Sequence, residues 1–180
     1  FRYSPDHMRA EENGTRLNHL NLFNIDRLDT YNNFEGGVST TLGFDYELKN
    51  PLRNFKLSAG QVINQKNNKN KPSSSSLDSR FSDFVGSSSL NINDKVSLNY
   101  NFSLDQNYQD FNNNEIGASF TNDQVKFNIN YLEEKDHIGN QEYFKSNIEI
   151  GKGEKGVFSA GTKRNLITNS AEYYNLSYEY

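Results

Sequence analysis

The stretch KVSLNYNFSLD, residues 95 to 105, alternates apolar and polar side chains at every position. A period of two is typical of a β-strand whose two faces meet different surroundings. The apolar side chains are those of Val96, Leu98, Tyr100, Phe102 and Leu104. The stretch therefore predicts a strand with one dry face and one wet face. The fold class depends on whether that dry face touches a protein core or lipid.

The same alternation returns along most of the chain, and residues 34–180 are predicted to hold about nine strands. The runs are 34–48, 55–63, 84–92, 96–104, 116–120, 125–131, 144–150, 158–162 and 174–180. The longer runs match the roughly 9 to 11 residues that a tilted strand needs to cross a bilayer. Residues 1–33 lack the pattern and are predicted to be an irregular extracellular loop that leads into the first strand.

The connections between these runs alternate between short and long. Short turns are expected at 50–53, 93–95, 122–123 and 153–155, and long polar connections at 65–79, 105–114, 133–141 and 164–171. Short periplasmic turns and longer extracellular loops are typical of an outer-membrane β-barrel. The sequence thus predicts an all-β fold, an antiparallel transmembrane barrel that is partial in this chain.

The four short turns also predict how the strands pair, because residues directly opposed in a hairpin share a face. The turns would place Leu48 opposite Phe55 and Ile92 opposite Val96. They would also place Phe120 opposite Val125 and Ile150 opposite Phe158. Each of these turns sets dry residues against dry residues.

Composition narrows the alternatives. Hydrophobic residues make up 33% of the 180 residues and the mean hydropathy is -0.90, yet aromatic residues reach 13%. A barrel reconciles these values, since only alternate residues face lipid. The net charge of -4 argues against nucleic-acid binding, which favours a basic surface. The chain has no Cys, and no apolar run is long enough for a membrane helix.

A soluble β-sandwich would also alternate apolar and polar residues, and it stays open as an alternative. The barrel is favoured because the dry face is nearly free of charges, while the wet face is rich in small neutral polar groups. Gln61 is the exception on the dry face, and the sequence does not explain it. The predicted lumen-facing residues are Ser87, Ser89, Ser97, Asn99, Asn101, Asn128 and Asn130.

Several motifs, taken in order, resemble a known family. They are LNLFNIDRLDTYNNFEGG before a strand, then LSAGQVI, then SRFSDFVGSSSLNINDKVSLNYNFSLDQN, and finally GTKRNLITNSAEYYNLSYEY. This succession is similar to the outer-membrane LPS-assembly family LptD, also called OstA or organic solvent tolerance protein. Within it, Asn21 to Asn24, Glu35, Ser58 and the Gly60-Gln61 pair match the family pattern. The usual Gly-Asp-Arg turn is replaced by LDTYNN, and the family's N-terminal periplasmic domain is absent, so the chain resembles a C-terminal barrel fragment.

The resemblance implies a translocon in the cell outer membrane that places lipopolysaccharide in the outer leaflet. It also implies three partners besides the membrane lipid: lipopolysaccharide itself, a plug lipoprotein similar to LptE, and a periplasmic transport bridge. No enzyme activity and no cofactor is expected. His7, His19 and His137 are isolated, which gives no metal site. The alternative function is a general diffusion channel, or porin.

Overall fold

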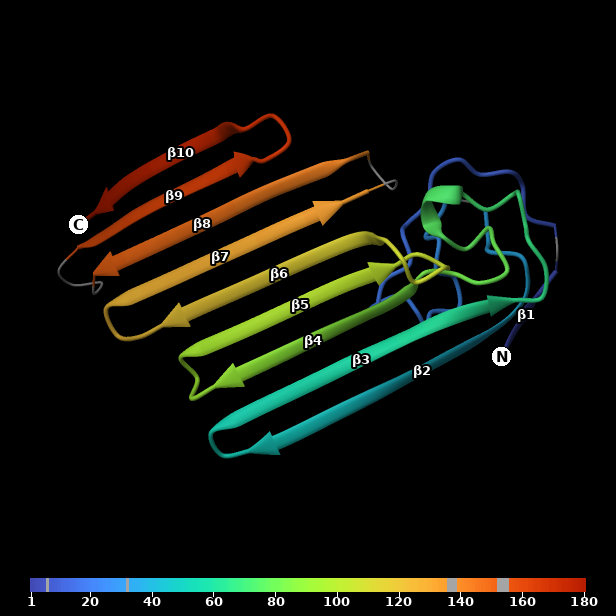
Figure 1. Ribbon diagram of the computed structural model, residues 1–180, viewed down its shortest axis with the longest axis horizontal. Coiled ribbons are helices and arrows are strands. Elements are labelled where there is room, and N and C mark those ends of the chain that lie inside the picture. The colour runs from blue at the N-terminus through green and yellow to red at the C-terminus, as the bar shows by residue number, and fades with distance from the viewer. Residues whose placement is uncertain (6, 32, 136–138, 152–155) are drawn as a thin grey trace.

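The computed structural model of the protein describes residues 1–5, 7–31, 33–135, 139–151 and 156–180. Ten antiparallel strands form one sheet in which every strand pairs with its neighbours in sequence (Figure 1). The strands are β1 (Arg2–Ser4), β2 (Gly37–Asn50), β3 (Arg53–Asn64), β4 (Phe84–Ile92), β5 (Val96–Leu104), β6 (Phe111–Thr121), β7 (Val125–Glu134), β8 (Gln141–Gly151), β9 (Val157–Asn165) and β10 (Ser170–Glu179). A short 3-10 turn, η1 (Ser73–Ser75), lies between β3 and β4. The predicted all-β antiparallel class is confirmed, and the sheet is open over the described residues.

Nine of these strands correspond to the nine predicted runs, and β1 is an addition. The sequence predicted no strand before residue 34, but Arg2–Ser4 pairs with Gly37–Ser39 at the start of β2. Three residues are too few to show a period of two, so the alternation could not reveal this strand. No helix in the described part of the chain is long and apolar enough to cross a membrane.

Three of the four predicted hairpin registers are confirmed. Leu48 lies opposite Phe55, Ile92 opposite Val96, and Ile150 opposite Phe158. The turn predicted at 153–155 itself lies outside the described residues. The β2–β3, β4–β5 and β6–β7 turns lie at one end of the sheet (Figure 1). The longer connections, which include residues 7–31, 65–83 and 105–110, lie at the other end.

The register predicted for the β6–β7 hairpin is wrong by two residues. Phe120 lies opposite Phe127 and not opposite Val125. The turn is wider because the Asn122 side chain organises it: its Oδ1 accepts hydrogen bonds from the backbone N–H groups of Gln124 (2.9 Å) and Val125 (2.7 Å). A shift of two residues keeps every side chain on its predicted face.

Several strands extend further than predicted at the long-loop end. The connection predicted at 105–114 ends earlier, because β6 already begins at Phe111. Asn113 pairs with Glu134 in the ladder, and its amide donates to the Glu134 carboxylate at 2.9 Å. Polar residues can continue a strand in this way without contributing to the hydrophobic pattern.

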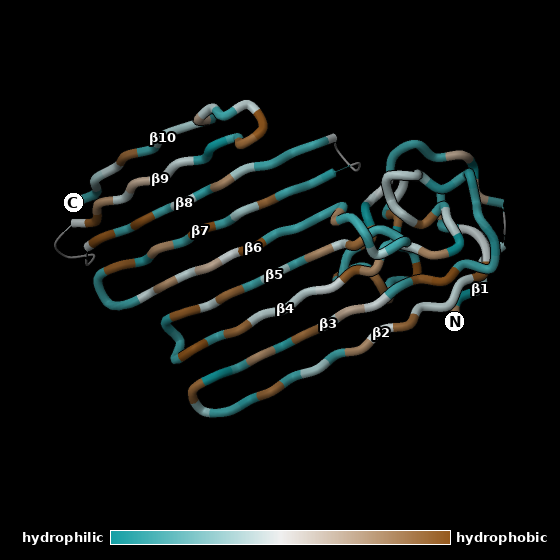
Figure 2. Tube along the Cα trace, in the orientation of Figure 1, coloured by the Kyte–Doolittle hydropathy of each residue, from teal (hydrophilic) through white to brown (hydrophobic). Residues whose placement is uncertain are grey.

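The two faces of the sheet differ, as the alternating colours along each strand in Figure 2 indicate. One face, the dry face, carries Val96, Leu98, Tyr100, Phe102 and Leu104 together with their apolar cross-strand partners. The opposite face, the polar face, carries Ser97, Asn99 and Asn101 and their partners. Much of the dry face is exposed in this chain: Leu98 is 43% exposed and Phe44 52%.

Part of the polar face is covered by irregular segments that we call the covering layer, residues 7–31 and 65–83. This layer packs on the sheet through a small hydrophobic core. The core consists of Met8, Leu17, Leu22, Leu28, Val62, Leu77 and Val85. Val62 on β3 and Val85 on β4 both point to the polar face. This face is therefore locally apolar where the covering layer packs on it.

Gly60 shows why small residues are needed under the covering layer. A Cβ at this position would lie 2.6 Å from Cδ2 of Leu22 and 2.5 Å from the Leu42 carbonyl oxygen. Any larger residue would push Leu22 away from the sheet, since such close contacts are not tolerated in a packed core. Glycine here allows the covering layer to approach the strand backbone.

Candidate functional site

The polar face brings together all seven residues that were predicted to face a lumen. Ser87 lies opposite Asn101 and Ser89 opposite Asn99, on β4 and β5. Ser97 lies opposite Ser119 on β6, and Ser119 in turn lies opposite Asn128 on β7. Asn99 and Asn130 flank Gly117 on either side. The registers therefore place these hydroxyl and amide groups on one continuous surface across four strands.

Side-chain amides flatten this surface. A Cβ at Gly117 would lie 2.5 Å from Oδ1 of Asn99, and one at Gly161 would lie even closer to the Oδ1 of Asn147. In both places an Asn side chain lies across a glycine of the neighbouring strand. The result is a low surface of hydrogen-bonding groups, which can donate to and accept from sugar hydroxyls or water.

The covering layer is fixed to β2 by a buried carboxylate, Glu35. Its Oε1 accepts from Nη2 of Arg27 at 2.5 Å and from Nζ of Lys71 at 3.0 Å, and its Oε2 accepts from Nε of Arg27 at 2.9 Å. Nη1 of Arg2 lies 3.3 Å from the same Oε1. Glu35 is fully buried and Arg27 is 1% exposed. One carboxylate thus joins three cations from β1 and from both segments of the covering layer.

Electrostatics follow from this arrangement. Burial alone would raise the pKa of Glu35, but the hydrogen bond from Arg27 and the charges of Arg27, Lys71 and Arg2 outweigh it and lower the pKa to about 2. Burial lowers the pKa of Lys71, against the attraction of Glu35, which raises it. Glu35 is therefore ionised throughout the physiological range.

Arg27 also reaches the sheet itself. Its guanidinium donates to the hydroxyl of Ser39 at 3.0 Å and to that of Thr41 at 3.2 Å, both on the polar face of β2. A planar guanidinium with five N–H donors can satisfy a carboxylate and two hydroxyls at once. Arg27 therefore holds the covering layer against the strand that follows it.

A second arginine, Arg16, fastens the covering layer at its far side. Its guanidinium donates to Oε1 of Glu134 at 2.5 Å, to the Asn112 carbonyl at 2.7 Å and to the Lys135 carbonyl at 2.9 Å. These acceptors belong to β6, to the last residue of β7 and to the residue that follows it. The covering layer is thus bonded to strands from β2 to β7.

Asp83, just before β4, forms a third attachment. Its Oδ2 accepts from the Ser103 hydroxyl at 2.7 Å and from the Asn112 amide at 2.9 Å. The β5–β6 ladder is irregular at this point, where Asn113 and Phe111 pair with successive residues of β5 and Asn112 is passed over. Burial raises the pKa of Asp83, although both hydrogen bonds lower it. The irregularity directs the Asn112 amide toward this carboxylate.

A pocket of about 320 Å³ lies between the covering layer and the polar face. It is lined by Thr15 to Leu20 on one side and by residues of β4–β7 on the other, including the predicted residue Asn101. Asn101 donates to Glu115 at 3.0 Å inside this pocket. Burial lowers the pKa of His19 at its rim, and nearby Glu115 raises it. The pocket offers amide, carboxylate and imidazole groups to a polar ligand.

A comparison with protein-family models gives a match over residues 14–178 to the model described as LptD, LPS transport system D. The chain belongs to the LptD family. No curated protein and no solved structure matches it. The family resemblance expected from the sequence is confirmed, and the open ten-stranded sheet is a section of the wall of an LptD-family β-barrel.

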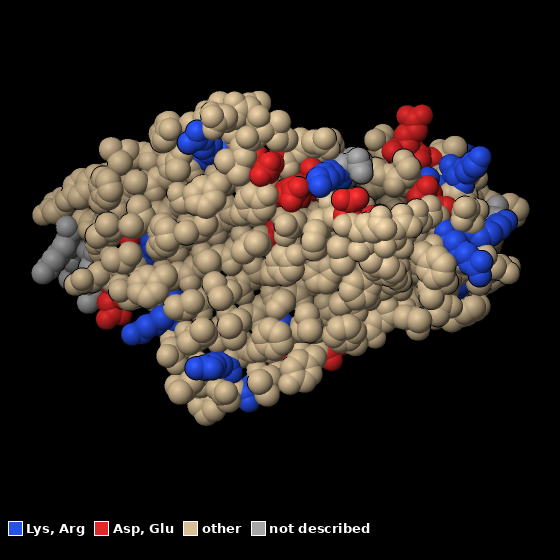
Figure 3. All heavy atoms as spheres, viewed as in Figure 1, with Lys and Arg blue, Asp and Glu red and all other residues tan. Residues whose placement is uncertain are grey.

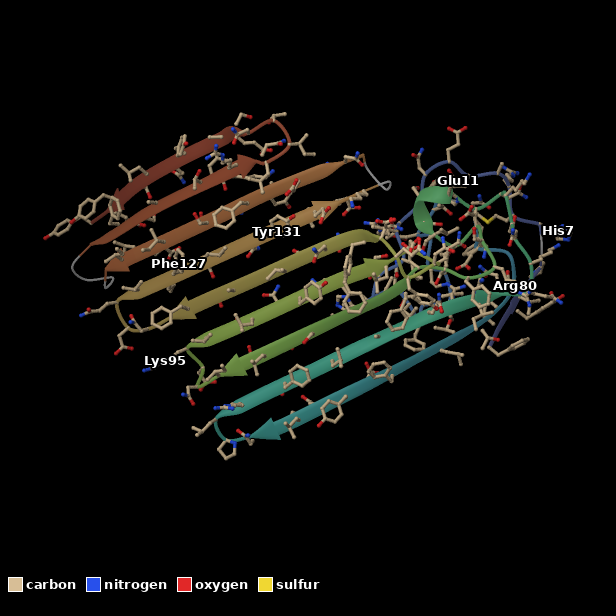
Figure 4. All side chains as sticks on the ribbon, viewed as in Figure 1. His7, Glu11, Arg80, Lys95, Phe127 and Tyr131 are labelled. Atoms are coloured by element: carbon tan, nitrogen blue, oxygen red, sulfur yellow. The ribbon has the colours of Figure 1, made fainter. Side chains whose placement is uncertain are left out.

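The dry face of this LptD-family sheet has the composition of an outer barrel surface. A groove of about 350 Å³ runs across it, lined by Phe127, Ile148, Ala160, Leu176 and their neighbours. In the face that Figure 3 shows, the charged side chains lie mainly toward the ends of the strands and around the covering layer. Figure 4 likewise places His7, Glu11 and Arg80 in the covering-layer region, away from Phe127 and Tyr131 on β7.

Gln61 is the polar residue of the dry face that the sequence did not explain, and both polar atoms of its side chain are hydrogen-bonded. Its amide nitrogen donates to the Ser82 carbonyl at 2.8 Å, and its Oε1 accepts from the Tyr108 hydroxyl at 2.7 Å. The Tyr108 ring lies 6.2 Å from the ring of Phe84 in an edge-on arrangement. Gln61 therefore ties the β5–β6 loop and the end of the covering layer to the rim of the sheet.

Sequence reasoning missed the residues that anchor the covering layer. Glu35 was noted as part of the family pattern, but Arg27, Lys71 and Arg16 were not singled out. No pattern in the sequence distinguished these residues, because they lie in irregular polar segments without a hydrophobic period. Of the three isolated histidines, His7 and His19 belong to the covering layer, and His137 lies outside the described residues.

Proposed function

We propose that the protein is part of an outer-membrane translocon that assembles lipopolysaccharide into the outer leaflet. Family membership supports transport of lipopolysaccharide, and the two-faced sheet supports a passage with an apolar outside and a polar inside. In this proposal the chain has no catalytic role. The observation that carries it is the continuous polar surface of Ser, Asn and Gly residues on β4–β7, opposite an apolar dry face.

In this proposal the two faces of the sheet contact different surroundings, membrane lipid on the dry face and the saccharide part of lipopolysaccharide on the polar face. The residues that face membrane lipid are Val96, Leu98, Tyr100, Phe102 and Leu104. None of them is charged, as a lipid-facing surface requires, because a charged group at mid-membrane would cost about 2–4 kcal/mol. The predicted lumen residues, from Ser87 to Asn130, face the saccharide part of lipopolysaccharide or the lipoprotein that plugs the lumen. Their amides and hydroxyls can hydrogen-bond to either.

The orientation follows the lengths of the connections. The short turns face the periplasm, where a transport bridge delivers lipopolysaccharide, and the long connections face the outside. The covering layer then closes the outer end of this part of the lumen. Its three attachments, at Glu35, Arg16 and Asp83, support this position of the covering layer against the polar face.

In-cell photocrosslinking from the full-length protein tests the proposal. A crosslinker is placed singly at residues 97, 98, 99, 100 and 101. Capture of lipopolysaccharide or a plug lipoprotein from 97, 99 and 101, with only lipid contacts from 98 and 100, is the expected result. Alternation without either partner would instead identify a porin-like channel. Absence of alternation would refute the barrel orientation.

A further inference from the structure

Two lysines lie side by side on the polar face at the part of the sheet that the covering layer leaves open. Lys145 on β8 is directly opposite Lys163 on β9. Directly opposed residues have Cβ atoms about 4.5–5.5 Å apart, and like charges in this position destabilise the sheet. The repulsion between the two ammonium groups therefore destabilises the sheet unless a nearby anion offsets their charge.

The described residues offset only one of the two charges. The Lys163 ammonium contacts Oε2 of Glu172 at 2.7 Å and lies 4.2 Å from the ring centroid of Tyr143. Lys145 is half-buried and has neither an ion pair nor a hydrogen bond to any described residue. By contrast, Lys126 on the same face lies 3.5 Å from its cross-strand partner Glu149. An unbalanced positive charge thus remains at Lys145.

The neighbours of Lys145 suit a sugar that carries an anionic group. Asn130 lies directly opposite Lys145 on β7, and the Asn147 amide lies two residues away across Gly161. Tyr143 lies two residues from Lys145 along β8, in the direction opposite to Asn147, and its ring is on the same polar face. Ammonium groups bind phosphate through charge-assisted hydrogen bonds, while amides bind hydroxyls and an aromatic ring packs against a sugar face.

We propose that Lys145 and Lys163 form a subsite for phosphate groups on the saccharide part of the cargo. This subsite rests on the proposed function, since it takes the polar face as the surface along which the saccharide moves. It would hold the anionic part of the molecule against β8 and β9, beside the Ser- and Asn-rich surface of β4–β7. Its ligand chemistry is that of a phosphorylated oligosaccharide.

The test compares a phosphorylated core oligosaccharide of lipopolysaccharide with the same oligosaccharide after enzymatic dephosphorylation. Binding of each to the full-length protein in detergent is measured by calorimetry for the unsubstituted protein and for the double variant Lys145→Gln/Lys163→Gln. Loss of charge-assisted hydrogen bonds should weaken binding of the phosphorylated probe about tenfold or more. Binding of the dephosphorylated probe should not change.

Control variants separate the site from general effects of charge and folding. Lys126→Gln, on the same face but paired with Glu149, should bind both probes as the unsubstituted protein does. Lys145→Arg should keep the binding of the phosphorylated probe. Heat-modifiable mobility on a gel shows that each variant is a folded barrel. Inorganic phosphate at the probe's concentration should not displace the probe, and displacement would show a free-phosphate site and overturn the assignment to a saccharide.

The outcomes distinguish the subsite from the translocon. Unchanged binding of the phosphorylated probe by the folded double variant, with lipopolysaccharide crosslinks from residues 97, 99 and 101 intact, overturns the subsite and leaves the translocon standing. Absence of those crosslinks in the otherwise unsubstituted protein overturns the translocon, and the subsite with it.

Discussion

The polar face has two regions that share one backbone pattern and differ in what lies on them. Over β2–β7 the covering layer is bonded to the sheet, and positions beneath it such as Gly60 and Val62 are small or apolar. Over β8–β10 no described segment lies on the face, which carries lysines, amides and tyrosines. The first region behaves as the inside of a small packed domain, and the second as an exposed polar wall.

The difference shows that an alternation of apolar and polar residues predicts a strand and its two faces, but not what packs against each face. Val62 is completely buried on a face that elsewhere is wet. The buried side-chain packing is therefore concentrated at one end of β2–β7, whereas the β8–β10 wall depends on backbone pairing. Substitutions should affect the two regions separately.

The largest expected effect comes from Glu35→Gln. The substitution leaves the Arg27 and Lys71 cations buried without their carboxylate, and breaking a buried ion pair costs about 3–5 kcal/mol. Hydrogen exchange should show lost protection in residues 7–31 of the full-length protein, with β8–β10 unchanged. Glu47→Gln, which alters an exposed pair with Lys56, serves as the control and should change nothing. Equal loss in both regions would contradict the separation.

Leu17→Ala should have the next largest effect. Leu17 is completely buried in the core of the covering layer, and removing such a side chain costs about 2–5 kcal/mol through lost burial and a cavity. Leu20→Ala, in the same segment at a side chain 77% exposed, should stay within about 0.5 kcal/mol. Denaturant-dependent proteolysis of the covering layer measures both. Equal sensitivity of the two variants would show that the core does not hold the layer.

Acid should loosen the covering layer through Glu35. Because its folded-state pKa is depressed from 4.5 to about 2, the stability it contributes is present above pH 4.5 and is lost as the pH falls toward 2, by roughly 3 kcal/mol in total. Pepsin cleavage within residues 7–31 should increase over this window. The Glu35→Gln variant should show no such dependence. A midpoint near pH 6 would indicate another group.

Tyr108→Phe should have the smallest effect. It removes the hydroxyl that donates to Gln61, a loss of about 1 kcal/mol in a partly exposed place. Hydrogen exchange should rise in the β5–β6 loop, 105–110, and not in the covering layer. Tyr174→Phe, at an exposed tyrosine of β10, is the matched control. An effect that spread to residues 7–31 would mean that this contact also secures the layer.

The sequence predicted the strands and their faces because both depend on local alternation. The β4 and β5 boundaries, 84–92 and 96–104, agree with the structure at both ends. The β6–β7 register failed because a single side chain, Asn122, widens the turn. The covering layer could not be predicted, since it has no period and its contacts join distant residues, such as Arg16 with Glu134 at a separation of 118 residues.

The order of the strands has a consequence for how the molecule assembles. Each strand pairs only with its neighbours in sequence, so the sheet can grow one hairpin at a time through loops whose closure entropy is small. The Arg16 contact cannot form until the end of β7 is in place. The covering layer can therefore be fastened at Glu35 as soon as residue 71 is in place, and at Glu134 only after β3–β7 have formed.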